Sequence, residues 1–126
     1  MLRFLLCLLL IFPAAPLWAE PLMGLWLTPE DHKGQVAHVR VRACGAGYCG
    51  RIVAVRKGGQ TIEHHNIGKD LFTDMQPQGG GAYAGTGWVP VHNVKIKGKA
   101  QVRGDTLVFS GCALGMCRRQ IWQRLK

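Results

Sequence analysis

The sequence has few of the residues on which most catalytic sites depend. It contains 7 Asp and Glu against 16 Lys and Arg among 126 residues, and Ser110 is its one serine. That serine lies outside a Gly-x-Ser-x-Gly motif, and no two carboxylates form a clear acid–base pair. A hydrolase would need a cleft that joins residues such as His92 and Asp74, which the pattern does not predict. We therefore expect a protein without enzyme activity and without a cofactor.

Metal ligands are also sparse. The side chains with suitable chemistry are His64, His65, His92, Asp70 and Asp74. Adjacent residues of a strand point to opposite faces, so His64 and His65 are not expected to share one ion. We expect no metal site.

Long hydrophobic runs are absent except at the start of the chain. Arg3 precedes an apolar run over residues 4–12, and two prolines and the small Ala19 follow it. This order is typical of a secretory signal peptide, and the run is less than half of the roughly 20 residues that a membrane-spanning helix needs. The sequence predicts a signal peptide over residues 1–19 and one domain over residues 20–126, with no transmembrane segment after cleavage. We expect a periplasmic or secreted protein of a Gram-negative bacterium.

Helical periodicity is hard to find after residue 20, whereas apolar and polar residues often alternate, as they do in residues 36–43. Strands are expected at 22–28, 36–43, 48–56, 60–64, 70–74, 83–91, 94–103, 106–110 and 120–125. The segment at 60–64 is the weaker one, so about eight short strands are expected. In one small domain they predict an all-β fold, a small antiparallel up-and-down β-barrel, with a small β-sandwich as the alternative. The glycine-rich residues 79–81 are expected to form a flexible loop that borders an open mouth of the barrel.

Four cysteines remain once the predicted signal peptide and its Cys7 are removed. They form two Cys-x4-Cys pairs around glycine, Cys44 with Cys49 and Cys112 with Cys117. An even number of cysteines in a small exported domain predicts disulfides, and the spacing favours these two local bridges over pairing between the two loops. A four-cysteine zinc site is a weaker alternative, because an oxidising compartment disfavours free thiolates.

Two tryptophans lie at the ends of the β-rich region. Gly24 and Trp26 open the first predicted strand, and Trp122 and Arg124 end the last. In lipocalin-like barrels, a Gly-x-Trp near the start is covered by an arginine of the final strand, whose guanidinium packs on the indole and shields it from water. We predict that Gly24, Trp26, Trp122 and Arg124 form such a closure here.

The formal net charge is +9, and much of the positive charge lies in two rows, each on one face of a predicted strand. The rows are His38, Arg40 and Arg42, and Lys95, Lys97 and Lys99. If both rows face outward on neighbouring strands, they form a basic wall that attracts phosphates, anionic glycans or an anionic membrane surface. Nucleic-acid binding is not expected, because few aromatic residues accompany these charges.

Several of these motifs together resemble an exported bacterial family, domain of unknown function 2147 (DUF2147). The resemblance is carried by Gly24-Leu25-Trp26, by Cys44-Gly45 leading to Cys49-Gly50-Arg51-Ile52-Val53, and by Gly111-Cys112 leading to Cys117-Arg118, Gln120, Trp122 and Arg124. It implies an exported protein with a small lipocalin-like fold, and it supplies no catalytic residues. The middle of the chain, around residues 70–77 and 88–90, departs from the family pattern, so the resemblance leaves the ligand open.

The sequence thus predicts an exported, non-enzymatic binding protein. The first hypothesis is a lipocalin-like barrel that carries a small hydrophobic or amphipathic ligand. The alternative is an interaction module whose basic surface binds an anionic cell-envelope component or a protein partner. A barrel interior filled by side chains would count against the first hypothesis.

Overall fold

The structure is a computed structural model that describes residues 11, 13 and 20–126. Apart from Ile11 and Pro13, the predicted signal peptide lies outside the described residues. The nine strands are β1 (Gly24–Leu27), β2 (Gln35–Cys44), β3 (Gly47–Lys57), β4 (Gln60–Ile62), β5 (Asp70–Gly79), β6 (Ala82–Val89), β7 (Val94–Arg103), β8 (Thr106–Ala113) and β9 (Met116–Leu125). Within the part of the chain that is described, no helix has the length and apolar character needed to cross a membrane.

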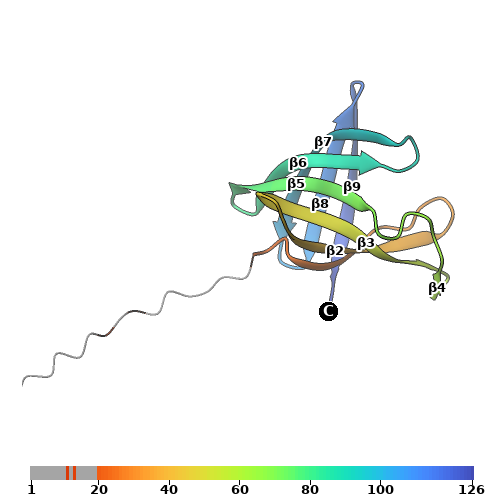
Figure 1. The fold of residues 1–126 in the computed structure, drawn as a ribbon, viewed down its shortest axis with the longest axis horizontal. Helices are drawn as coiled ribbons and strands as arrows, with labels where there is room; N and C mark the ends of the chain where they lie inside the picture. Colours follow the sequence, from red (N-terminus) through yellow and green to blue (C-terminus); the bar gives the residue numbers. More distant parts are fainter. Residues whose placement is uncertain (1–10, 12, 14–19) are drawn as a thin grey trace, which may run out of the picture.

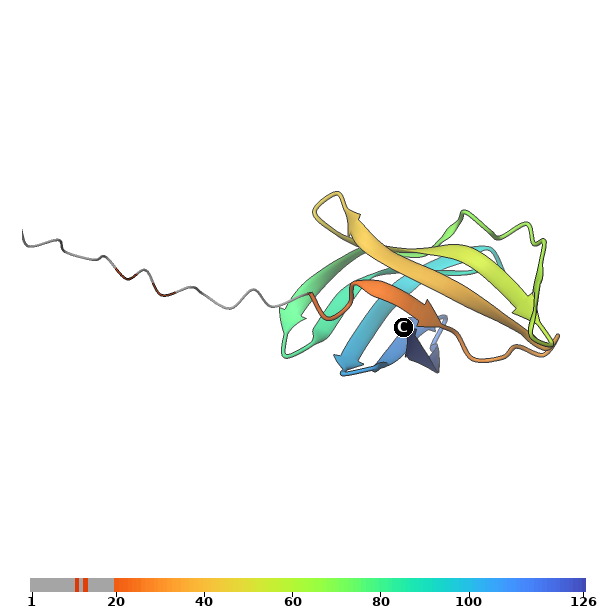
Figure 2. The same cartoon turned by 90° about the horizontal axis from the view of Figure 1, so that it is seen from below.

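Eight of the strands close into an antiparallel barrel, as the sequence predicted (Figures 1 and 2). The sheet runs in the order β2-β1-β9-β8-β7-β6-β5-β3-β4, and an additional pairing of β2 with β3 closes the ring. Strand β4 lies outside the ring and pairs with β3 alone. The pairing of the first strand with the last removes the open edges of a sandwich, so the sandwich alternative is wrong.

The alternation of side chains creates an apolar interior and a polar exterior. On β2, Val39 and Val41 are buried, while Arg40 between them is exposed. On β7, Ala100 and Val102 are buried, while Lys99 and its neighbours along the same face are exposed or half-buried. The alternation that predicted these strands is therefore also the alternation of their side chains between the core and the surface.

Strand β5 is longer than expected, and the glycine-rich loop is not at an open mouth. Residues 76–79 continue the strand past a register shift, and Asp74 in this irregular region has a φ of 52°. Gly80 and Gly81 form a tight turn, and the amide of Val102 on the neighbouring strand β7 donates to the Gly81 carbonyl at 2.8 Å. Because the strands run alternately up and down, this turn lies at the end of the barrel where β1 begins. The predicted position of residues 79–81 is wrong.

The two ends of the barrel differ. One end, called the closed end below, holds the start of β1, the end of β9 and the turns β2–β3, β5–β6 and β7–β8. The other, called the open end, holds the β6–β7 turn and the β8–β9 hairpin. In Figure 1 this hairpin projects at the top of the view beyond the other strands.

Large side chains fill most of the interior. Trp26, Trp122, Phe72, Met75 and Leu107 are all buried in one cluster. The ring of Phe72 also lies beside the backbone of β3 at Gly50, where a Cβ would meet the ring carbons at 2.5–3.0 Å. Glycine at that position is what allows the large ring to enter.

Candidate functional site

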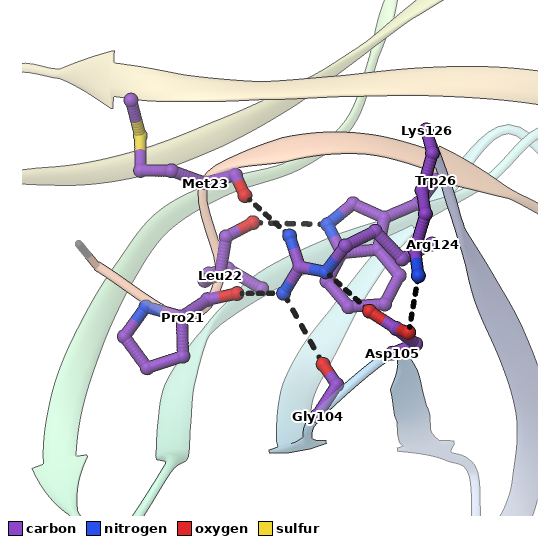
Figure 3. A network of polar contacts seen from close by, with 8 residues as sticks. All are labelled: Pro21, Leu22, Met23, Trp26, Gly104, Asp105, Arg124 and Lys126. Atoms are coloured by element: carbon purple, nitrogen blue, oxygen red, sulfur yellow. Dashed lines mark hydrogen bonds and ion pairs between the residues drawn. The ribbon is translucent and has the colours of Figure 1, made fainter.

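The closed end is sealed by Arg124 and Trp26 (Figure 3). The guanidinium carbon of Arg124 lies 4.3 Å from the centroid of the fully buried Trp26 ring. Its Nη1 donates to the Met23 carbonyl at 2.8 Å, and its Nη2 donates to the Pro21 carbonyl at 2.6 Å. A Cβ on Gly24 would lie 3.1 Å from Nη1, so the small residue leaves space for the arginine. This end therefore offers a structural plug rather than an entrance.

Trp122 takes no part in that plug. Its ring stacks on Phe109 with a centroid distance of 5.3 Å and lies 6.2 Å from the ring of Phe72. Its indole nitrogen donates to the Gln120 side chain at 2.9 Å. The role in closure predicted for Trp122 is wrong. The residue lies two positions before Arg124 on β9, deeper in the barrel, and packs on the core instead.

The four cysteines form the two local disulfides that the spacing favoured. Cys44 is bonded to Cys49, and Cys112 is bonded to Cys117. The first bridge lies in the β2–β3 hairpin at the closed end, and the second lies in the β8–β9 hairpin at the open end. Pairing between the loops and a shared zinc site are both wrong, because the two pairs lie at opposite ends of the barrel.

The histidine pair does not adopt the expected arrangement. His64 and His65 lie in the loop after β4, and their rings stack with centroids 4.5 Å apart instead of pointing to opposite faces. The reason is that the strand ends at Ile62, before the histidines begin. Burial, followed by the charge of neighbouring His65, lowers the pKa of His64. In the described residues, no group of three or more His, Cys, Asp or Glu side chains is arranged to hold a metal ion.

The two basic rows do not form one wall. Strands β2 and β7 are separated by three strands in either direction around the ring. On the first side, Arg42 and Arg51 both contact Asp70, at 3.1 and 3.6 Å. The ion pairs of the described residues include none to Lys97 or Lys99 of the second row. The condition for a single wall, that the two strands are neighbours, is therefore not met; within the described residues Arg42 is the one member of either row that forms an ion pair.

A small apolar recess enters the barrel at the open end. Its volume is about 150 Å³. Its walls include the side chains of Leu71, Val89, Ile96, Phe109 and Trp122. Buried core side chains, among them Phe72 and Met75, lie deeper in the barrel, so the recess is a shallow entrance and not a deep calyx.

Arg118 and Gln120 add polar groups to this recess. Arg118 lies four positions and Gln120 two positions before Trp122 on β9, so both side chains have the same orientation as Trp122, and both residues are solvent-exposed. The sequence pattern did not predict a binding role for Arg118, because the residue lies beside a cysteine and a second arginine, where alternation is hard to see. The signal that was available is its spacing of four residues from the buried Trp122.

Comparisons with known proteins place the chain in a bacterial family and support the fold. The family described as "Uncharacterized protein conserved in bacteria (DUF2147)" matches residues 24–124. A solved structure with 14% identity has a TM-score of 0.65 and covers 83% of each chain; it is described as "Protein HP1028 from the human pathogen Helicobacter pylori belongs to the lipocalin family". None of the curated proteins matches this sequence. At this identity the structural likeness shows the barrel fold alone.

Proposed function

Since the chain belongs to the DUF2147 family and folds as a lipocalin-like barrel, we propose that it is a binding protein for a small amphipathic ligand with an anionic head group. The ligand enters the open end of the barrel. The observation that carries this proposal is the recess of about 150 Å³, which combines apolar walls with the exposed guanidinium of Arg118.

The size of the recess defines the apolar part of the ligand. An apolar cavity of about 150 Å³ holds a group the size of benzene, whereas sites for larger ligands have volumes of about 300–1,000 Å³. A phenyl ring or a short alkyl chain therefore fits, and a long acyl chain does not. This narrows the small hydrophobic or amphipathic ligand that the sequence predicted to one whose apolar part is no larger than a phenyl ring or a short alkyl chain.

The chemistry of Arg118 defines the head group. Its planar guanidinium carries fixed positive charge and binds a carboxylate or phosphate through two parallel hydrogen bonds. Its neighbour Gln120 accepts a hydrogen bond from Trp122 through its carbonyl oxygen, which leaves the side-chain amide as a second donor. The arrangement binds and orients a ligand, and we propose no catalytic step.

Two disulfides suit an oxidising compartment. Together with the predicted signal peptide, they support the proposal that the protein acts in the periplasm or is secreted. Mass spectrometry of protein exported by its own leader tests this, because a chain that begins at Glu20 and lacks four hydrogens is expected. Retention of residues 1–19 would contradict export by cleavage.

Binding is tested by NMR titration of residues 20–126 with phenylacetate and with alkanoates from butanoate to decanoate. Affinity is expected to rise with chain length and then level off once the recess is full. Arg118→Gln should weaken phenylacetate binding about tenfold, because it removes a charge-assisted hydrogen bond of about 1.4 kcal/mol or more. The matched control Arg119→Gln lies on the opposite face of β9 and should bind normally.

A second pair of variants tests the location. Val89→Phe adds a ring to the wall of the recess and should abolish binding. Val91→Phe makes the same change in the β6–β7 turn, where the side chain is 77% exposed, and should leave binding unchanged. Equal effects of the two variants, or an absence of chemical-shift changes in the wild-type protein, would contradict the proposal.

A further inference from the structure

The tip of the β8–β9 hairpin presents bare apolar side chains to solvent. Leu114 is fully exposed and Met116 is 66% exposed. Both lie at or beside the turn that connects Ala113 to β9, in the hairpin that projects from the open end (Figure 1). Nothing in the described part of the chain covers them.

The backbone at this tip is unfavourable for leucine. Leu114 has a φ of 52° and Gly115 has a φ of 75°, which is the pattern of a type I′ turn. Asn-Gly is the preferred sequence for such a turn, because asparagine tolerates the left-handed conformation and a bulky residue does not. Leu114 therefore costs stability without contributing to the core. Strain that persists at an exposed apolar residue points to a contact outside the barrel.

The disulfide between Cys112 and Cys117 holds the base of the hairpin. Only the residues of the turn and the two that flank it, 113–116, lie beyond the bridge. The tip is thus organised before it meets a partner, which reduces the conformational entropy lost on binding.

Positive charge surrounds the base of the same hairpin. Lys97 faces Cys112 in the register of β7 and β8, and Lys99 and Arg119 both face Ser110. Arg118 and Arg119 are adjacent on β9, so they point to opposite faces of the hairpin. These four cations form no ion pair within the described residues, and strands β6 to β9 contain no acidic residue.

We propose that this tip, residues 114–116, anchors the barrel to the surface of an anionic lipid bilayer. The apolar tip enters the interface below the head groups, and Lys97, Lys99, Arg118 and Arg119 contact the lipid phosphates. An apolar tip with cations beside it is the chemistry that such a surface recognises. Cations on both faces of the hairpin suit a planar surface approached end-on better than a one-sided protein interface. The anchoring shares Arg118 with the proposed ligand site but does not rest on that site, because the apolar tip and the other three cations lie outside the recess.

The first test measures the binding of residues 20–126, which contain all nine strands, to sedimented vesicles. Vesicles of phosphatidylglycerol with phosphatidylethanolamine should bind the protein, with an affinity that falls steeply with salt. Vesicles of phosphatidylcholine alone should bind it weakly. An absence of binding to the anionic vesicles overturns the proposal and leaves a protein pocket as the partner of the tip.

Leu114→Asn separates membrane contact from folding. The variant should unfold at the same temperature as the wild type or higher, because asparagine suits the turn. Its affinity for anionic vesicles should fall about tenfold, as expected when most of a buried leucine side chain is lost. Ile67→Asn, at a half-exposed position in the loop between β4 and β5, is the matched control and should bind normally. Wild-type affinity of Leu114→Asn overturns the proposal.

The charge is tested with two double variants that change the net charge equally. Lys97→Gln with Lys99→Gln should weaken vesicle binding about fivefold for each lysine removed. Arg40→Gln with Lys57→Gln removes two exposed cations from β2 and β3 and should have a much smaller effect. Equal losses in the two variants would show attraction by net charge alone and overturn the docking orientation.

Discussion

Arg124 and Trp26 are direct cross-strand partners in the pairing of β9 with β1, and their side chains stack at 4.3 Å. This contact lies where the last strand meets the first, which is the pairing with the longest sequence separation in the barrel. The same guanidinium also contacts Asp105 at 3.4 Å, in the turn between β7 and β8. One side chain thus connects the segment before β1, the final strand and a hairpin turn.

Replacement of Arg124 is expected to destabilise the barrel. Arg124→Ala removes hydrogen bonds from a charged donor and the stacking on Trp26, and should lower the free energy of unfolding by about 2–4 kcal/mol. Arg124→Lys should be intermediate, because lysine keeps the charge without the planar fork. Urea unfolding followed by circular dichroism measures both. Arg103→Ala, an exposed arginine on β7, is the control and should change stability by less than about 0.5 kcal/mol.

Substitution of Gly50 tests the packing of the interior. Gly50→Ala places a methyl group against the ring of Phe72 and should lower stability by about 1–3 kcal/mol through overpacking. Phe72→Leu removes the ring and should be destabilising alone. The double variant should be more stable than the sum of the two single effects predicts, because the clash is then absent. Strict additivity in thermal unfolding would show that the ring and the backbone do not compete for this space.

The two disulfides are expected to contribute similarly to stability. Each closes a loop with a sequence separation of 5, so removal of either bridge as a Cys→Ser pair should cost on the order of 2 kcal/mol by the loop-closure entropy. Differential scanning calorimetry of the two double variants measures this. A loss confined to one of the bridges would contradict the entropic explanation.

The stability should also depend on pH through His38. Burial, with a smaller contribution from the charge of Arg56, lowers the pKa of His38 in the folded protein. The unfolded chain then binds protons more readily, so the free energy of unfolding is greatest above about pH 6.5 and falls as the pH is lowered past that value. Urea midpoints at about pH 7.5 and about pH 5 should show this fall. In His38→Gln the fall should be smaller, and an equal fall would contradict the assignment.

Much of the fold was predictable because alternation is local. In β2 and β7, a few residues are enough to tell the buried face, with its valines, from the exposed face, with its charged residues. The short spacing of the cysteines likewise indicated the two local bridges. Predictions failed where backbone geometry departs from the period of two. The irregular region around Asp74 lengthened β5 beyond its expected end, and the end of β4 at Ile62 left His64 and His65 in a loop.

The candidate sites were only partly predictable. Whether the two basic rows form one wall depended on β2 and β7 being neighbours, and the ring places three strands between them on each side. Arg118 was not singled out, because its position beside the recess depends on residues from β5, β6, β7 and β8 as well as its own strand. Leu114 was not singled out either, since neither its exposure nor its left-handed backbone can be read from the residue itself.

The residue pattern was sufficient to favour a closed β-barrel over a sandwich, the two local disulfides over pairing between the loops, and a contact of Arg124 with Trp26. Each follows from a repeated period, a short spacing or a motif at the two ends of the chain. The three-dimensional packing alone shows that the interior is largely filled, that Arg42 and Arg51 share the carboxylate of Asp70 while Lys97 and Lys99 form no ion pair within the described residues, and that an apolar tip projects from the open end. The physical reason is that packing, ion pairing and exposure depend on side chains that come together from strands far apart in the sequence.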